Sequence, residues 1–120
     1  MQYLLMIYNE EEMFATVGKE EQEALYKQYA AFGSEFRGSI QGSNRLQPTS
    51  VATTVRVRDG KTLTVDGPFA ETKEQLGGYY LVEAANLDEA VAMAAKIPAA
   101  WHGSIEVRPI WAMAAAQGGN

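Results

Sequence analysis

Two strand-like segments of this chain, residues 3–8 and 79–84, are apolar on both faces. Successive side chains of a strand point to opposite faces of its sheet. In the first segment two apolar sets alternate, namely Tyr3, Leu5 and Ile7 with Leu4, Met6 and Tyr8. An apolar sheet face of this size is rarely left in water. We therefore expect the central sheet to be covered on both sides.

The periodicity elsewhere predicts two helices. The first is expected over about 19–40, with an apolar stripe of Leu25, Tyr29, Phe32, Phe36 and Ile40. The second is expected over 86–98, where Asn86 is a helix cap, Glu89 has the spacing of a capping box and Pro98 stops the helix. Its expected buried stripe is Leu87, Ala90, Val91 and Ala94.

Further strands complete an α+β pattern. Residues 51–58 and 61–65 flank an Asp-Gly pair typical of a tight hairpin turn, and 104–111 alternate apolar and charged side chains. The order of elements predicts a ferredoxin-like sandwich with an inserted β-hairpin, formed by residues 1–112 and followed by a frayed tail at 113–120. Both helices then cover one sheet face. We expect a second copy to cover the other, which makes the protein a homodimer.

Composition excludes several classes of function. The 120 residues carry a net charge of −5 with no cluster of Lys or Arg, which argues against nucleic-acid binding. The chain has no Cys, one His and no metal-ligand spacing, and it lacks nucleotide-binding glycine motifs. The N-terminal apolar run is too short for a signal peptide or a membrane span. These features predict a cytoplasmic protein without metal or cofactor and without membrane contact.

The segment DGPFAETKEQLGGYY, residues 66–80, is longer than a hairpin turn requires. An Asp before a turn usually accepts a hydrogen bond from the amide two residues ahead, but here that residue is Pro68, which has none. Asp66 is therefore expected to bond further along, to Phe69 or Ala70, or to serve another purpose. Phe69 is expected to pin the loop, and the spacing of Thr72 and Gln75 predicts one helical turn.

DGPFAETKEQLGGYYLVE at 66–83, with YLLMIY at 3–8 and EVRPI at 106–110, resembles the YCII-related family, in the branch named for its DGPFAETKE motif. The resemblance implies a dimeric α+β barrel. Related barrels include small-molecule isomerases, monooxygenases and non-catalytic members, and the branch often accompanies alternative sigma factors. In YCII-like proteins a His–Asp pair is regarded as the active site. Asp66 matches the acidic position, whereas His102 lies just before the last strand, unlike the family pattern.

Candidate site residues follow from these patterns, each with a structural alternative. Asp66 is either a turn residue or a general base, and His102 is either an exposed loop histidine or a proton shuttle. Arg108 is expected either to pair with Glu106 or to hold a ligand carboxylate. The other candidates are a ligand-facing wall of Tyr8, Phe69 and Tyr80 and the loop charges Glu71, Lys73 and Glu74.

Two functions fit this set of residues. One is a cofactor-free enzyme of isomerase or lyase type, acting on a small and anionic organic molecule. The other is a non-catalytic module that senses a ligand or binds a protein in stress signalling.

Overall fold

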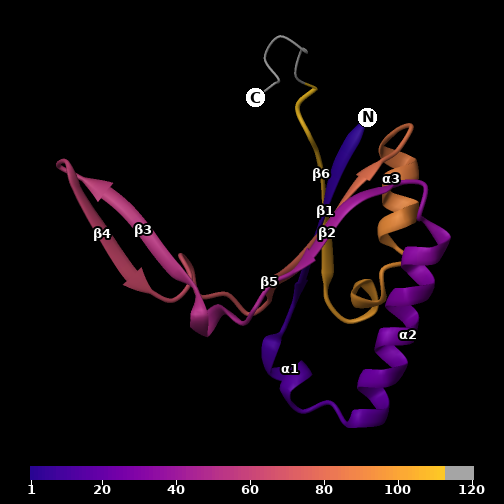
Figure 1. Ribbon diagram of the computed structural model, residues 1–120, viewed down its shortest axis with the longest axis horizontal. Coiled ribbons are helices and arrows are strands. Elements are labelled where there is room, and N and C mark those ends of the chain that lie inside the picture. The colour runs from indigo at the N-terminus through magenta and orange to yellow at the C-terminus, as the bar shows by residue number, and fades with distance from the viewer. Residues whose placement is uncertain (113–120) are drawn as a thin grey trace.

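The computed structural model describes residues 1–112, so the predicted tail at 113–120 lies outside the described residues. Figure 1 shows the elements. They are β1 (Gln2–Asn9), α1 (Glu11–Ala15), α2 (Lys19–Glu35), β2 (Ile40–Arg45), η1 (Thr49–Val51), β3 (Thr53–Arg58), β4 (Lys61–Asp66), β5 (Gln75–Glu83), α3 (Leu87–Ala94), η2 (Pro98–Trp101) and β6 (Ser104–Pro109).

Four strands form one antiparallel sheet in the order β2-β5-β1-β6. With α2 between β1 and β2 and α3 between β5 and β6, this is the ferredoxin-like topology. The hairpin β3–β4 is inserted between β2 and β5 as a separate two-stranded sheet. The predicted α+β fold and its inserted hairpin are confirmed.

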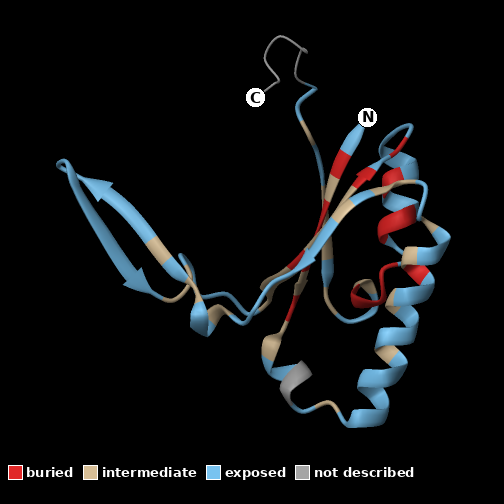
Figure 2. Ribbon diagram, in the orientation of Figure 1, coloured by how far each residue is buried: buried red, intermediate tan, exposed pale blue. Residues whose placement is uncertain are grey.

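The core lies between the sheet and the helices. Tyr3, Leu5 and Ile7 of β1 are buried there with Val82 of β5, and Phe32 packs on them from α2. Figure 2 shows that the buried residues gather where α3 and the C-terminal part of α2 face the sheet. The N-terminal part of α2 is largely exposed (Figure 2). The helix therefore contacts the core mainly through its last turns.

The first long helix ends earlier than its apolar spacing predicts. α2 stops at Glu35, and the expected helical position Ile40 instead begins β2. Ile40 pairs with Val82 and packs on the same core as the helix, so the apolar spacing continues across the turn. β2 was not predicted as a strand because its sequence IQGSNR lacks apolar alternation.

The cap of α3 is as predicted, but its buried face is rotated. The Asn86 Oδ1 accepts a hydrogen bond from the Glu89 amide at 2.9 Å. Ala90 and Ala94 are buried, whereas Leu87 and Val91 are half exposed and were wrongly assigned to the stripe. The buried face also contains Met93 and, after the helix, Ile97. At 100° per residue, positions 90, 93, 94 and 97 form one face and leave 87 and 91 at its flank.

The hairpin β3–β4 extends away from the sheet and helices (Figure 1). Asp59 and Gly60 both have positive φ, 54° and 74°, as the predicted tight turn requires. The hairpin carries exposed apolar side chains with exposed fractions of 46–63%, namely Val55, Val57, Leu63 and Val65. A two-stranded hairpin has little stability on its own in water. This arm therefore needs a surface to pack against.

The second face of the sheet is not covered by a helix of the described chain, since α2 and α3 lie on the same side (Figure 1). The register pairs Leu4 with Leu81 and Met6 with Tyr79, so these side chains share that face. Leu4, Tyr79 and Leu81 are half-buried there. We call this apolar surface, which also includes Tyr8, the open face.

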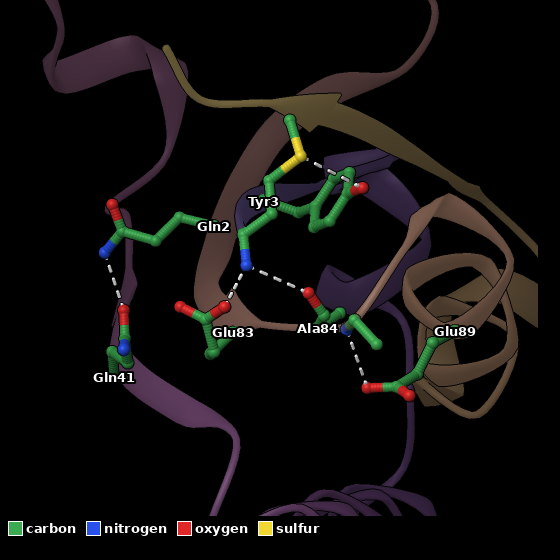
Figure 3. Close-up of polar contacts among 8 residues, drawn as sticks. Gln2, Tyr3, Gln41, Glu83, Ala84 and Glu89 are labelled. Atoms are coloured by element: carbon green, nitrogen blue, oxygen red, sulfur yellow. Dashed lines mark hydrogen bonds and ion pairs between the residues drawn. The ribbon is translucent and has the colours of Figure 1, made fainter. Parts of the chain in front are cut away.

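The N-terminal end of the sheet is held by polar contacts (Figure 3). The Met1 ammonium forms an ion pair with Glu83 and donates a hydrogen bond to the Ala84 carbonyl at 3.1 Å. The Gln2 side chain donates to the Gln41 Oε1 at 2.7 Å. These contacts join β1, β5 and the edge strand β2. The candidate site lies at the opposite end of the same three strands.

Candidate functional site

A cavity of about 440 Å³ lies between α2 and the ends of β1, β5 and β2. We call it the α2 cavity. It forms on the side of the sheet that faces α2, whose N-terminal and middle turns contribute Gln22, Leu25, Tyr26 and Tyr29. Its volume lies within the range of small-molecule sites, roughly 300–1,000 Å³.

Two glycines of the GGYY sequence line the cavity on the sheet side. Gly78 lies opposite Ile7 of β1 and Arg45 of β2 in the strand register. A Cβ atom at Gly78 would lie 2.8 Å from the Asn44 carbonyl oxygen, closer than real contacts allow. Glycine at this position therefore lets β2 pair closely with β5. It also leaves the sheet surface beneath the cavity without a side chain.

Asn9, at the end of β1, is the one buried polar residue of the described core, with 8% of its surface exposed. Its side chain lines the α2 cavity, and a Cβ atom at Gly77 would lie 3.4 Å from its Oδ1. Within residues 1–112 the Asn9 side-chain amide has no protein hydrogen-bond partner. Buried polar groups are nearly always bonded. This amide is thus positioned to bond a molecule in the cavity.

Two tyrosines that line the cavity, Tyr29 and Tyr80, have hydroxyls with raised pKa values. Burial, together with the nearby Tyr80, raises the pKa of Tyr29 from 10.0 to about 12. A hydrogen bond with the Ala99 backbone and the charge of Arg45 act in the opposite direction. Burial also raises the pKa of Tyr80, whose ring centroid lies 4.9 Å from that of Phe32. Both hydroxyls stay protonated at neutral pH and can donate hydrogen bonds, but they are not bases.

Arg45 and Glu11 are the charged side chains that line the cavity. Arg45 is exposed, and within the described chain its guanidinium forms no ion pair or side-chain hydrogen bond. Glu11 is engaged, because its Oε2 accepts from the Thr49 amide at 2.8 Å and its Oε1 accepts from the Thr49 hydroxyl at 2.7 Å. Glu11 keeps its negative charge but is held on Thr49, and within the described chain Arg45 forms no ion pair with it.

Of the residues expected from the sequence, Tyr80 lines this cavity. Asp66 ends β4, is exposed, and has no side-chain hydrogen bond within residues 1–112. The turn after it is held by other groups. The Gly67 amide donates to the Ala52 carbonyl at 2.7 Å, and the Thr54 hydroxyl donates to the Gly67 carbonyl at 3.0 Å. The expected bonds from Asp66 to the Phe69 or Ala70 amide are absent from the described chain.

Phe69 does not pin the loop, since 76% of it is exposed; its ring instead lies 5.2 Å from the Arg56 guanidinium. The predicted helical turn at 72–75 is also wrong, because Gln75 already begins β5. There the Gln75 side chain donates to the Thr72 carbonyl at 2.5 Å. Favourable pairing of Gln75 with β1 takes precedence over the local capping pattern.

The three loop charges lie near the body of the protein. Lys73 is 3.7 Å from Glu10, and the Glu74 Oε1 accepts from the Ser104 hydroxyl at 2.9 Å. Glu71 lines a smaller cavity of about 320 Å³, which shares Glu11 with the α2 cavity. The loop thus connects the base of the hairpin to the region beside the α2 cavity.

The remaining candidates lie outside the α2 cavity. His102 is exposed just after η2, and its backbone amide bonds the Ala99 carbonyl at 3.3 Å. Glu106 and Arg108 form an ion pair on β6, on the side opposite Ile105 and Val107. Tyr8 and this pair share the open face. A single chain therefore does not bring Asp66, His102 and Arg108 to the α2 cavity.

Asn9, Tyr29 and Arg45 line the cavity but were not predicted as site residues. Tyr29 was assigned only to the apolar stripe of the helix. A tyrosine hydroxyl on a core-facing stripe usually needs a polar partner, which indicates polar groups or a cavity beside it. The paired glycines at 77–78 were a second signal, because a glycine inside a strand often marks close approach of another group. No local sequence pattern identifies Asn9 or Arg45 as a site residue.

Residues 1–112 contain neither a metal-ligand cluster nor a helix able to span a membrane. Within them, no group of three or more His, Cys, Asp or Glu side chains is placed to hold a metal ion. In the same part of the chain, no helix combines the length and apolar character needed to cross a membrane.

Comparison with known proteins agrees with this fold. The YCII-related domain matches residues 1–114. The chain is also similar to the uncharacterized protein R00369 of Rhizobium meliloti (strain 1021), with 41% identity over 114 residues that cover 92% of each protein. The predicted family resemblance is confirmed over nearly the whole chain. This protein therefore belongs to the YCII-related domain family.

Proposed function

We propose that this protein binds a small organic molecule in the α2 cavity. The observation that carries the proposal is the Asn9 side chain, which lines the cavity, belongs to a residue only 8% exposed, and has no protein hydrogen-bond partner within the described chain. No fully buried side-chain nitrogen or oxygen of the described residues lacks a partner, so the Asn9 amide keeps access to the cavity. A molecule bound there can form hydrogen bonds with it.

The composition of the cavity wall supports the same function. Ligand sites combine a mostly apolar wall with a few placed polar groups. Here Ile7 and Leu25 are apolar, while Asn9, Tyr29 and Tyr80 supply polar groups. They come from β1, α2 and β5, elements of the packed body rather than of the hairpin.

A cavity-filling variant tests this function. Ser43 lines the cavity from the edge strand β2, where a tryptophan is sterically tolerated because the residue is exposed. We expect Ser43→Trp to abolish binding of fragments detected by ligand-observed NMR, and Gln47→Trp, outside the cavity, to preserve it. Fragments that bind equally well to Ser43→Trp and wild type would refute the proposed site.

We further propose that the protein is a homodimer in which a second copy covers the open face and the hairpin. The apolar side chains of both surfaces support this arrangement, since neither has a cover within the described chain. Large exposed apolar surfaces often mark an interface. On the hairpin this surface is divided between two faces, with Val55 and Val57 on one and Leu63 and Val65 on the other. Light scattering at micromolar concentration should give twice the chain mass, 2 × 13.1 kDa. A mass of 13.1 kDa would contradict the dimer.

A catalytic form of the proposal adds proton transfer by Asp66, as in a cofactor-free isomerase or lyase. Within one chain this carboxylate does not line the α2 cavity. Catalysis therefore requires Asp66 of a second copy to reach the bound molecule. Hydrogen–deuterium exchange on a bound fragment, lost in Asp66→Asn, would support the enzyme. Binding without exchange favours a cytoplasmic ligand-sensing module.

A further inference from the structure

Resting on the proposed function, we propose that the α2 cavity selects an aromatic carboxylic acid, with its carboxylate on Arg45 and its ring against the apolar wall. The proposal concerns the ligand class alone. It stands on three features of the cavity: one unpaired cation, one acid that is already engaged, and neutral hydroxyl donors.

Arg45 is placed to bind an anion. It is the one Lys or Arg among the residues lining the cavity, and its cross-strand neighbour on β5 is Gly78. No neighbouring side chain at that position competes for the space above the glycine. Arg45 and Tyr29 line the same cavity, and the charge of Arg45 lowers the pKa of the Tyr29 hydroxyl. A guanidinium offers five donors in a planar fork that matches a carboxylate.

The acidic residue of the cavity does not neutralise Arg45. Both Glu11 oxygens accept hydrogen bonds from Thr49, at 2.7 and 2.8 Å. Glu11 also lines the smaller cavity, so it lies at the boundary between the two spaces. Its hydrogen bonds to Thr49 hold the Glu11 carboxylate at that boundary, and it forms no ion pair with Arg45, so the Arg45 guanidinium is available to an anion.

The polar side chains of Asn9, Tyr29 and Tyr80 in the cavity wall carry no negative charge that would repel an anion. Tyr29 and Tyr80 keep their protons at neutral pH, because the ordinary tyrosine pKa of 10.0 already lies well above it and burial raises the pKa of both. They contribute donors and no negative charge. Asn9 offers both a donor and an acceptor, and so suits a hydroxyl or carbonyl group on the same ring. Ile7, Leu25 and the exposed Tyr26 provide the apolar and aromatic wall.

Three probes of one shape and different charge test the ligand class: benzoate, benzamide and benzylammonium. We expect benzoate to bind about tenfold or more tightly than benzamide in NMR titrations at neutral pH, since hydrogen bonds to charged groups are the stronger ones. Benzylammonium should bind more weakly than benzamide. Arg45→Gln should remove the preference for benzoate. Arg37→Gln, an exposed arginine outside the cavity, should keep it.

The outcomes separate this inference from the proposed function. If benzamide or benzylammonium binds as well as benzoate, or if Arg45→Gln keeps the preference, the ligand class is wrong. Binding that is still lost in Ser43→Trp would then leave the cavity as the site. If all probes bind Ser43→Trp as well as wild type, the proposed function itself is refuted. Failure of all three to bind wild type at millimolar concentration also overturns the aromatic-acid class.

Discussion

Replacing Asn9 with leucine should make the protein more stable while it removes a ligand contact. The two side chains have the same branched shape, so the substitution exchanges an unpaired amide for methyl groups in place. Asn9 is 8% exposed and has no side-chain partner within residues 1–112. Functional groups are often held at some cost in stability, and this residue is the clearest example in the chain.

The expected gain follows from two contributions. A fully buried unpaired amide costs about 1–3 kcal/mol, but the Asn9 amide is accessible from the cavity, since no fully buried side-chain nitrogen or oxygen of the described residues lacks a partner. Its penalty is therefore smaller. Added apolar burial contributes about 0.8 kcal/mol per methylene in a fully dry site, and less at a cavity wall. We expect Asn9→Leu to raise the free energy of unfolding by up to about 1 kcal/mol. The melting temperature should rise by at most roughly 4–8 °C.

Urea unfolding at pH 7 and one protein concentration measures this change. Asn44→Leu is the matched control, because the Asn44 side chain donates to the Tyr79 hydroxyl at 2.7 Å. The control should lose about 0.5–1.5 kcal/mol, the value of an ordinary hydrogen bond. A loss of about 1 kcal/mol or more in Asn9→Leu would refute the reasoning. It would mean that the amide stabilises the fold and is not held for a ligand.

Three further changes have defined outcomes. Asp66→Asn should alter the free energy of unfolding by less than about 0.5 kcal/mol in urea, because the side chain is exposed and unbonded within residues 1–112; a loss above 1.5 kcal/mol would contradict this. Gly78→Ala should cost about 2 kcal/mol or more by the same assay, since its Cβ would lie 2.8 Å from the Asn44 carbonyl oxygen; a neutral result would disprove the close strand contact. For Tyr29, the folded pKa of about 12 exceeds the unfolded value of 10.0, so its contribution is complete below pH 10 and is lost toward pH 12. Tyr29→Phe should reduce that alkaline loss by on the order of 1 kcal/mol, allowing for partial exposure, and an unchanged pH profile would count against the buried phenol.

The parts of the fold that sequence predicts are those governed by local chemistry. The Asp-Gly turn requires positive φ at two positions, and Asp59 and Gly60 adopt it. At the predicted cap of α3 the Asn86 side chain accepts from the Glu89 amide, while the Glu89 carboxylate accepts from the amide of Ala85, one residue before the cap. The alternation of β6 places Ile105 on the helix side, with the charged residues opposite.

The parts that sequence does not predict depend on partners distant in the chain. β2 is a polar edge strand whose pairing with β5, rather than its own pattern, makes it a strand. The α2 cavity depends on the same pairing, which brings Arg45 of β2 beside Asn9 of β1 and Tyr29 of α2. No spacing rule connects these three positions. They meet because the sheet order places β5, with its two glycines, between β2 and β1.

The DGPF segment shows how local and distant effects combine. Gly67 has φ +106°, a conformation that other residues rarely adopt, so glycine is required there by the backbone alone. Pro68 removes the amide that Asp66 would otherwise bond. The carboxylate is thus presented outward from the base of an arm whose apolar residues also face outward. Whatever covers that arm also determines the surroundings of Asp66, and a second copy is the cover we propose. On this reasoning, changing Val57 to lysine should weaken both the dimer and any activity that depends on Asp66, while benzoate binding in the α2 cavity persists.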